Sequence, residues 1–204
     1  MMKPSHFFAM LSRMKYITRW GLMRNTRTEN LSEHSLETAY IAHVLAVIHN
    51  KRLHGNIDEN KVAVIAMYHD LSEILTGDLP TPVKYHSPSF QHSYKEIERQ
   101  ASKRMLHMLP EDLRPSFWAA ALPEDEECKR FVKYADKISA YIKCIEEEKA
   151  GNQEFKTAKE SIYQAILDFH APEVDIFLKE FMPGYYLTVD QNTALLKKGE
   201  DEDK

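Results

Sequence analysis

Five ionisable side chains fall inside segments that are otherwise apolar and helical in pattern. His34 lies near the start of one segment, His69, Asp70 and Glu73 lie in a second, and Asp136 lies in the middle of a third. Buried ionisable groups are costly unless they are paired or bind a metal. Two imidazoles with two carboxylates suit a divalent transition-metal ion. The set therefore predicts a metal centre shared by three helices.

The spacing around His69 adds a possible acid or base to this centre. Glu73 follows His69 by four residues and Asp70 by three, so all three share one face if the segment is a continuous helix. Such a carboxylate can orient or deprotonate a water, or pass a proton to a leaving group. A single histidine on a helix is more often a core or surface residue, and a His-Asp pair is common by chance. The inward positions of His34 and Asp136 make the whole set hard to explain in that way.

Apolar residues at helical spacing predict the elements that would hold these side chains. The central helix is expected to bury Leu36, Tyr40 and a core histidine, His43, with Ile41 and Leu45 on a second apolar face.

The other expected elements are also helical. The loop over residues 78–82 contains Pro80 and Pro82, which are expected to exclude a helix there. The expected boundaries are a helix over residues 5–18, the N-cap Ser32 of the central helix, a third helix from the cap Asp58 to Gly77, helices over 88–109 and 110–122, a long helix from Pro123 to Gly151, a helix over 155–169, a short one over 174–181, and an irregular segment over 183–204.

The sum of these elements is a single all-α domain of about six to eight helices, and composition agrees with it. The 204 residues suit one domain, 43% of them are hydrophobic and 28% are charged, and glycine occurs only 6 times. The glycine-rich patterns that bind dinucleotides or cradle triphosphates do not occur in the sequence. These observations disfavour dinucleotide-binding and P-loop proteins.

Charge and cysteine usage limit the partners and the compartment. The 27 basic and 31 acidic residues give a net charge of −4, which disfavours a nucleic-acid polymer as partner. Neither a membrane-spanning apolar run nor a signal peptide is recognisable, so we expect a cytoplasmic protein without a membrane partner. Cys128 and Cys144 are 16 residues apart on one expected helix. That spacing separates them by about 24 Å, too far for a disulfide, and predicts two free thiols.

The sequence resembles a known family at several of these positions. His34, the His69-Asp70 pair and Asp136 resemble the H…HD…D signature of the HD-domain metal-dependent phosphohydrolases. Residues 5–39, 66–85 and 132–147 are similar to the YfbR-type 5′-deoxynucleotidases, and the likeness extends from about Ser5 to Gly184.

The resemblance implies a fold, an activity and a set of site residues. It implies a compact HD-domain helical fold over residues 1–184, an acidic tail over 185–204 and a homodimer. The implied enzyme removes the 5′-phosphate from deoxyribonucleoside 5′-monophosphates with one divalent ion, Co²⁺, Mn²⁺ or similar. The site residues carried over by motif are the metal ligands His34, His69, Asp70 and Asp136, the catalytic Glu73, and the substrate-binding Arg19, Trp20, Asp78 and Thr81.

The chemistry of these residues agrees with phosphate-ester hydrolysis. A bound ion polarises the phosphoryl group and lowers the pKa of a water, and the Arg19 guanidinium offers a planar fork for phosphate oxygens. Two other functions stay open. The first is that of another HD phosphohydrolase, which acts on a nucleoside triphosphate or a cyclic nucleotide. The second is that of a non-catalytic nucleotide-sensing HD module. The second alternative would be expected to lack a ligand or Glu73, and all are present.

Overall fold

The computed structural model describes residues 4–194 and is all-α over that range, as the sequence predicts. The α-helices within it outnumber the six to eight expected, because several are only one turn long. Most of the expected acidic tail, residues 195–204, lies outside the described part of the chain. The helices are α1 (Phe7–Leu11), α2 (Leu31–Arg52), α3 (Glu59–Tyr68), α4 (Glu73–Thr76), α5 (Thr81–Lys84), α6 (Pro88–Leu106), α7 (Arg114–Ala121), α8 (Glu126–Lys149), α9 (Lys156–Leu167), α10 (Pro172–Glu180) and α11 (Met182–Tyr186).

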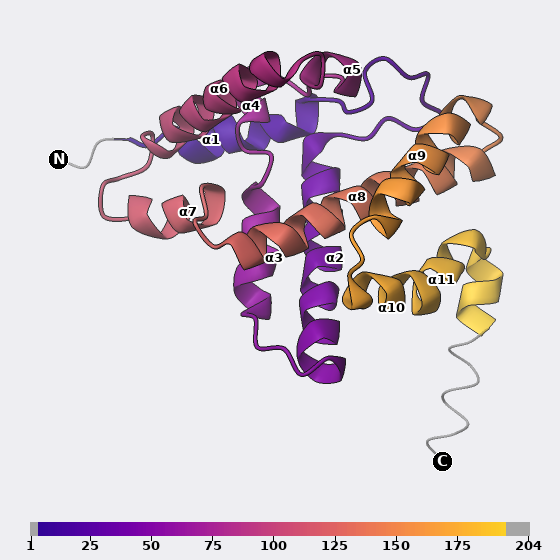
Figure 1. Ribbon diagram of the computed structural model, residues 1–204. Helices are drawn as coiled ribbons and strands as arrows, with labels where there is room; N and C mark the ends of the chain where they lie inside the picture. The colour runs from indigo at the N-terminus through magenta and orange to yellow at the C-terminus, as the bar shows by residue number, and fades with distance from the viewer. Residues whose placement is uncertain (1–3, 195–204) are drawn as a thin grey trace.

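The helices α2, α3 and α8 form the centre of the molecule. α2 and α3 lie side by side as a hairpin, and α8 crosses both of them (Figure 1). Their facing side chains build the main core, which includes the fully buried Leu45 and Ile138. A smaller core, with Phe7, Leu71 and Met105, lies where α1 and α6 meet. The predicted metal ligands come from the three central helices or their ends, so this packing positions them.

The N-terminus of α2 is fixed by a capping box. The N-cap is Asn30 and not the predicted Ser32. The Asn30 side chain accepts hydrogen bonds from the amides of Ser32 and Glu33 at 3.0 and 3.1 Å, and the Glu33 carboxylate accepts one from the Asn30 amide at 3.4 Å. Asn30 also forms an isolated β-bridge with Thr18. The bridge explains why the helix starts where it does.

The buried face of α2 is the second of the two apolar faces in its sequence. Ile41 and Leu45 are buried, whereas Leu36 is 45% exposed and Tyr40 is 66% exposed. His43 is exposed and is not the core histidine that the spacing suggested. A helix that is apolar on two sides gives no periodic signal for which side packs inward. The contacts of α2 with α3 and α8 determine which side is buried.

The helix expected over residues 58–77 is interrupted. α3 ends at Tyr68, residues 69–72 form a turn, and α4 follows. In this turn the amides of Leu71 and Glu73 bond to carbonyl oxygens three residues back, at 3.1 and 3.0 Å, and not four residues back as in an α-helix. The predicted single helical face for the three ionisable residues of this segment is therefore wrong.

The long helix α8 agrees with its prediction. It follows the N-cap Asp125, and its buried face includes Ala135 and Ser139. Cys128 and Cys144 are both buried and both free. Alternation of apolar and charged residues along this helix leaves only one face that can pack inward.

Both ends of the described chain differ from the sequence prediction. The helix expected over residues 5–18 is α1 followed by a 3₁₀-helix, Ser12–Tyr16. The segment expected to be irregular from residue 183 contains part of α11 and a helical stretch over residues 189–194. Within residues 4–194, every helix is too short or too polar to cross a membrane.

Residues 18–30 connect the 3₁₀-helix to α2, and we call this segment the strap. A buried carboxylate of α8, Glu147, holds its middle. Glu147 accepts hydrogen bonds from the Thr26 amide and hydroxyl at 2.8 and 2.6 Å, from Lys143 at 2.5 Å and from Asn152 at 2.8 Å. Burial raises the pKa of Glu147, but these donors lower it by more, so the pKa lies well below its usual value.

We expect Glu147→Gln to lower the free energy of unfolding by about 3 kcal/mol near neutral pH, because the buried Lys143 ammonium loses its counter-charge. A depressed carboxylate pKa stabilises the fold above the unfolded-state value of about 4.3, and that contribution is lost as the pH falls below it. The gap between wild type and variant should therefore shrink at acidic pH. Urea unfolding at several pH values measures it, with the exposed neighbour Glu146→Gln as the control. An unchanged stability at neutral pH would contradict the role of Glu147.

Candidate metal and substrate site

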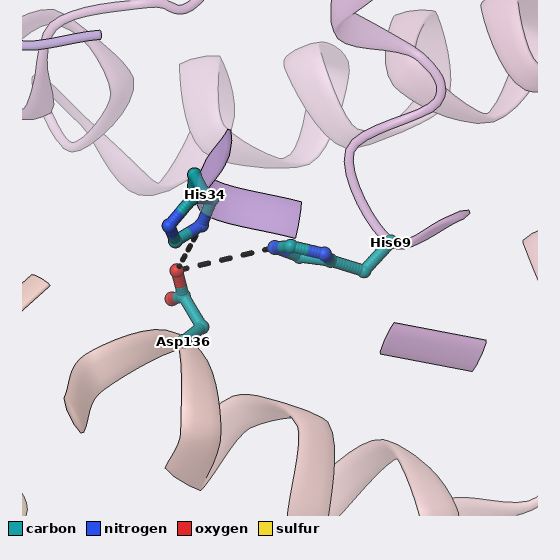
Figure 2. Close-up of side chains that lie close together, drawn as sticks. All are labelled: His34, His69 and Asp136. Carbon is teal, nitrogen blue, oxygen red and sulfur yellow. Dashed lines mark ion pairs between the residues drawn. The ribbon is translucent and has the colours of Figure 1, made fainter. Parts of the chain in front are cut away.

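Three of the predicted metal ligands meet where α2, the end of α3 and α8 converge (Figure 2). One donor atom from each of His34, His69 and Asp136 lies within 4.8 Å of the other two. The Asp136 Oδ1 is 3.1 Å from the His34 Nε2 and 4.0 Å from the His69 Nε2. Two atoms bound side by side to one ion at about 2.1 Å lie roughly 3.0–3.4 Å apart. The distance between Asp136 and His34 lies in this range and the distance between Asp136 and His69 is longer. The three residues form a group that could hold a metal ion.

The hydrogen bonds of His69 leave its other nitrogen free for a cation. Its Nδ1 is 2.7 Å from the Ala66 carbonyl oxygen, which only accepts, so Nδ1 carries the proton. The Nε2 therefore presents a lone pair. This atom is buried and has no hydrogen-bond partner in the described chain. A buried lone pair directed at carboxylates is satisfied by a metal ion, so the residues present fit a divalent ion.

His34 is fully buried and is held from behind. Its Nδ1 is 3.0 Å from the Ser139 hydroxyl. Burial is the main cause that lowers the pKa of His34, and the nearby Arg19 lowers it further, against the effects of Asp136 and Asp70. The imidazole is therefore neutral near pH 7, which is the form that binds metals.

The fourth predicted ligand, Asp70, lies beside this group. Its Oδ2 is 3.3 Å from the His69 Nε2 and 3.6 Å from the His34 Nε2. The same oxygen is 3.4 Å from the Arg19 Nη1. Asp70 therefore connects the metal-binding group to the guanidinium predicted to hold phosphate.

A carboxylate that the sequence reasoning missed fixes Arg19 and Trp20. The Glu29 Oε2 accepts hydrogen bonds from the Arg19 Nε at 3.1 Å and from the Trp20 indole at 3.0 Å. Trp20 has a φ of 60° and its ring lies 5.2 Å from that of Phe155. A left-handed conformation in a non-glycine residue costs about 1–2 kcal/mol and persists only where the surroundings impose it. Glu29 is the lone acidic residue among the basic residues of the first 30. That isolation is the sequence feature that could have identified it as their partner.

Glu73, at the first position of α4, is buried close to Asp70 and Asp78. It is 5% exposed, and its Oε2 has no hydrogen-bond partner in the described chain. Burial raises the pKa of Glu73 to about 9, with Asp70 and Asp78 adding to the rise and Lys84 and Arg19 opposing it. A carboxyl group with such a pKa holds its proton at neutral pH and can donate it.

The remaining predicted substrate contacts, Asp78 and Thr81, lie on either side of Pro80. The prolines were expected to exclude a helix from this segment, but Thr81 begins the one-turn helix α5, because Pro82 lies in its first turn, where no backbone N–H is needed. Burial raises the pKa of Asp78, and Arg19 and the Trp20 backbone amide oppose that rise. Asp78 therefore lies close to the predicted phosphate-binding residues. Thr81 is exposed at the start of α5, and its contact with substrate stays a prediction.

Comparisons with known proteins identify the family of the chain. Residues 6–185 match the family model described as 5′-deoxynucleotidase YfbR-like. Proteins named 5′-deoxynucleotidase from Yersinia pestis (strain Pestoides F) and Yersinia pseudotuberculosis (serotype O:3, strain YPIII) are 50% identical over 190 residues, which cover 92% of this chain and 96% of each relative.

Two solved structures share the fold. An HD-domain phosphohydrolase from Listeria innocua superimposes with a TM-score of 0.76 at 22% identity, over 88% of each chain. A cyanophage S-2L HD phosphohydrolase, described as bound to dA and one catalytic Zn²⁺ ion, superimposes with a TM-score of 0.64 at 18% identity, over 92% of this chain and all of that one.

Proposed function

The chain belongs to the YfbR-like 5′-deoxynucleotidase family, and from this premise we propose that it hydrolyses deoxyribonucleoside 5′-monophosphates to deoxyribonucleosides and phosphate. One observation carries the proposal beyond the family. The His69 Nε2, which has no hydrogen-bond partner among residues 4–194, and the Asp136 carboxylate fit a metal ion, and Arg19 is joined to this group through Asp70. A metal-binding group beside a fixed guanidinium suits a phosphate ester.

His34, His69 and Asp136 would hold the ion, with Asp70 as the fourth ligand. When bound, such an ion polarises the phosphoryl oxygen and lowers the pKa of a water. The two imidazoles and two carboxylates suit Co²⁺, Mn²⁺ or a similar transition ion.

The chain's own residues then have distinct tasks. Arg19, oriented by Glu29, binds the negatively charged phosphate oxygens. As water adds to phosphorus and the bond from phosphorus to the 5′-oxygen breaks, Glu73 gives its proton to that leaving oxygen. Of the two roles that the sequence left open for Glu73, the raised pKa favours the proton donor. Asp78 and Thr81 contact the sugar in this proposal.

The proposal includes a small-molecule substrate, a homodimer and a cytoplasmic setting, with neither a membrane nor a nucleic-acid polymer as partner. The net charge of −4 supports the small substrate. The exposed Leu36 and Tyr40 on α2 support the homodimer, because exposed apolar side chains that lie together on a helix are typical of protein contacts.

Phosphate release from a panel of substrates tests the function. We expect deoxyribonucleoside 5′-monophosphates to be hydrolysed faster than ribonucleotides, activity to be lost after chelation, and added Co²⁺ or Mn²⁺ to restore it. Preferred hydrolysis of dATP or of cyclic AMP would instead support one of the other HD phosphohydrolase activities. Absence of turnover on every substrate with metal bound would support a sensing module.

Trp20→Ala is expected to narrow the preference for dAMP over AMP by about 100-fold in kcat/KM. The indole is held by Glu29 beside Arg19, where its bulk closes the space that a 2′-hydroxyl needs. Steady-state kinetics on both substrates measure the ratio, with the chain's other tryptophan, in Trp118→Ala, as the control. An unchanged ratio in a folded Trp20→Ala protein would mean that Trp20 only packs against Phe155.

A further inference from the structure

A polar pair, one buried serine and one half-buried glutamate, lies behind His34, on the side away from Asp136. Ser139 is on α8 and fully buried, and Glu37 is on α2, one turn after His34. The Ser139 hydroxyl donates a hydrogen bond to the Glu37 Oε2 at 2.6 Å. The same hydroxyl oxygen is 3.0 Å from the His34 Nδ1.

The hydrogen bond from Ser139 to Glu37 favours one direction for the contact between Ser139 and His34. A serine hydroxyl has one hydrogen and can accept with its lone pairs. Because that hydrogen points to Glu37, the contact between Ser139 and His34 requires the proton of the Nδ1. With its proton on Nδ1, the neutral imidazole of His34 carries its lone pair on Nε2. That nitrogen is 3.5 Å from the Thr38 hydroxyl, which can donate to it, and 3.1 Å from the Asp136 Oδ1, which competes for the proton in the metal-free chain.

We propose that Glu37 and Ser139 are positioning residues that set the tautomer of His34, so that its Nε2 is the metal-binding atom. The inference rests on the proposed metal role of His34. His69 reaches the same tautomer through the Ala66 backbone carbonyl, which no substitution removes. His34 reaches it through two side chains, so its tautomer depends on sequence. Partners of this kind behind a ligating histidine typically strengthen metal binding by about 10–100-fold.

The alternative is that the pair only ties α2 to α8. Two variants and a matched control separate these roles. Ser139→Ala removes the hydroxyl, whereas Glu37→Gln keeps a carbonyl oxygen that accepts from it. Ser35→Ala, next to His34, removes another buried hydroxyl, one that has no hydrogen-bond partner in the described chain.

The measurements are ¹⁵N NMR of the His34 ring in the metal-free protein and calorimetric titration with Co²⁺, near pH 8. That pH lies above the value of about 7 to which burial raises the pKa of Glu37, so Glu37 is an acceptor. We expect the proton on Nδ1 in the wild type, in Glu37→Gln and in Ser35→Ala. Ser139→Ala should lose this preference and bind Co²⁺ about 10–100-fold more weakly.

A wild-type His34 with its proton on Nε2 would overturn the proposal, as would a Ser139→Ala protein that binds Co²⁺ with wild-type affinity. A loss of thermal stability in Ser139→Ala with both readouts unchanged would establish the purely structural alternative and also overturn it. If His34→Ala binds Co²⁺ as tightly as wild type, the proposed metal role fails. The tautomer in the metal-free chain still decides whether Glu37 and Ser139 orient His34.

Discussion

Glu73→Gln is expected to lower kcat by about 10²–10⁴-fold while the folded protein keeps its metal, because an amide cannot supply the proton that the leaving oxygen needs. The substitution preserves the size of a side chain that is only 5% exposed. It also removes a buried carboxyl group whose pKa is raised to about 9, so the fold should lose little stability. Phosphate release and metal analysis on the purified variant measure the two effects separately.

A matched control for Glu73 exists on α6. Lys84 is 2.9 Å from the Glu98 carboxylate and 4.0 Å from that of Glu73. Glu98→Gln therefore removes the other carboxylate around the same ammonium without altering any proposed metal ligand. We expect its kcat to stay within a few-fold of wild type. A Glu73→Gln protein as active as Glu98→Gln would exclude Glu73 as the proton donor.

His69→Ala and Asp136→Asn are expected to lose bound metal and, with it, the stability that the metal provides. An ion that binds only the folded chain stabilises it by about 2.7 kcal/mol at a concentration 100 times its Kd. Wild type should therefore gain thermal stability on addition of Co²⁺, and both variants should gain much less. Metal analysis after purification and thermal unfolding with and without Co²⁺ check this.

The control is His43→Ala, which removes an exposed histidine of α2. It should bind Co²⁺ and respond to it as wild type does. Stoichiometric metal with wild-type affinity in either His69→Ala or Asp136→Asn would show that the ligand set is wrong.

The sequence could predict the parts of the fold in which local pattern and packing agree. α8 has apolar residues on one face only, so the positions that point inward follow from their spacing. These positions include Ala135, next to Asp136. α2 could not be oriented in this way, because both Leu36 and Ile41 lie on apolar faces and only contact with α3 and α8 buries the second.

The break after α3 has a cause that spacing does not record. The His69 imidazole bonds to the Ala66 carbonyl oxygen, and the backbone of the following residues tightens to contacts three residues apart. The side chains behind the site are also invisible to local pattern. Glu29 and Ser139 take their roles from partners 10 and 102 residues away in sequence, Arg19 and Glu37.

The strap has a consequence for the order in which the molecule assembles and opens. Its middle is bonded to Glu147 across 121 residues of sequence, so it cannot dock until α8 is in place. Contacts of such separation form late in folding, after the local helices. Because α2, α3 and α8 pack against one another without it, the strap can also detach as a unit, with its contacts to Glu147 lost together. Such an opened state would keep His34 and His69 together and lose the proposed phosphate contact of Arg19. On that proposal, its population sets the fraction of folded protein that cannot capture substrate.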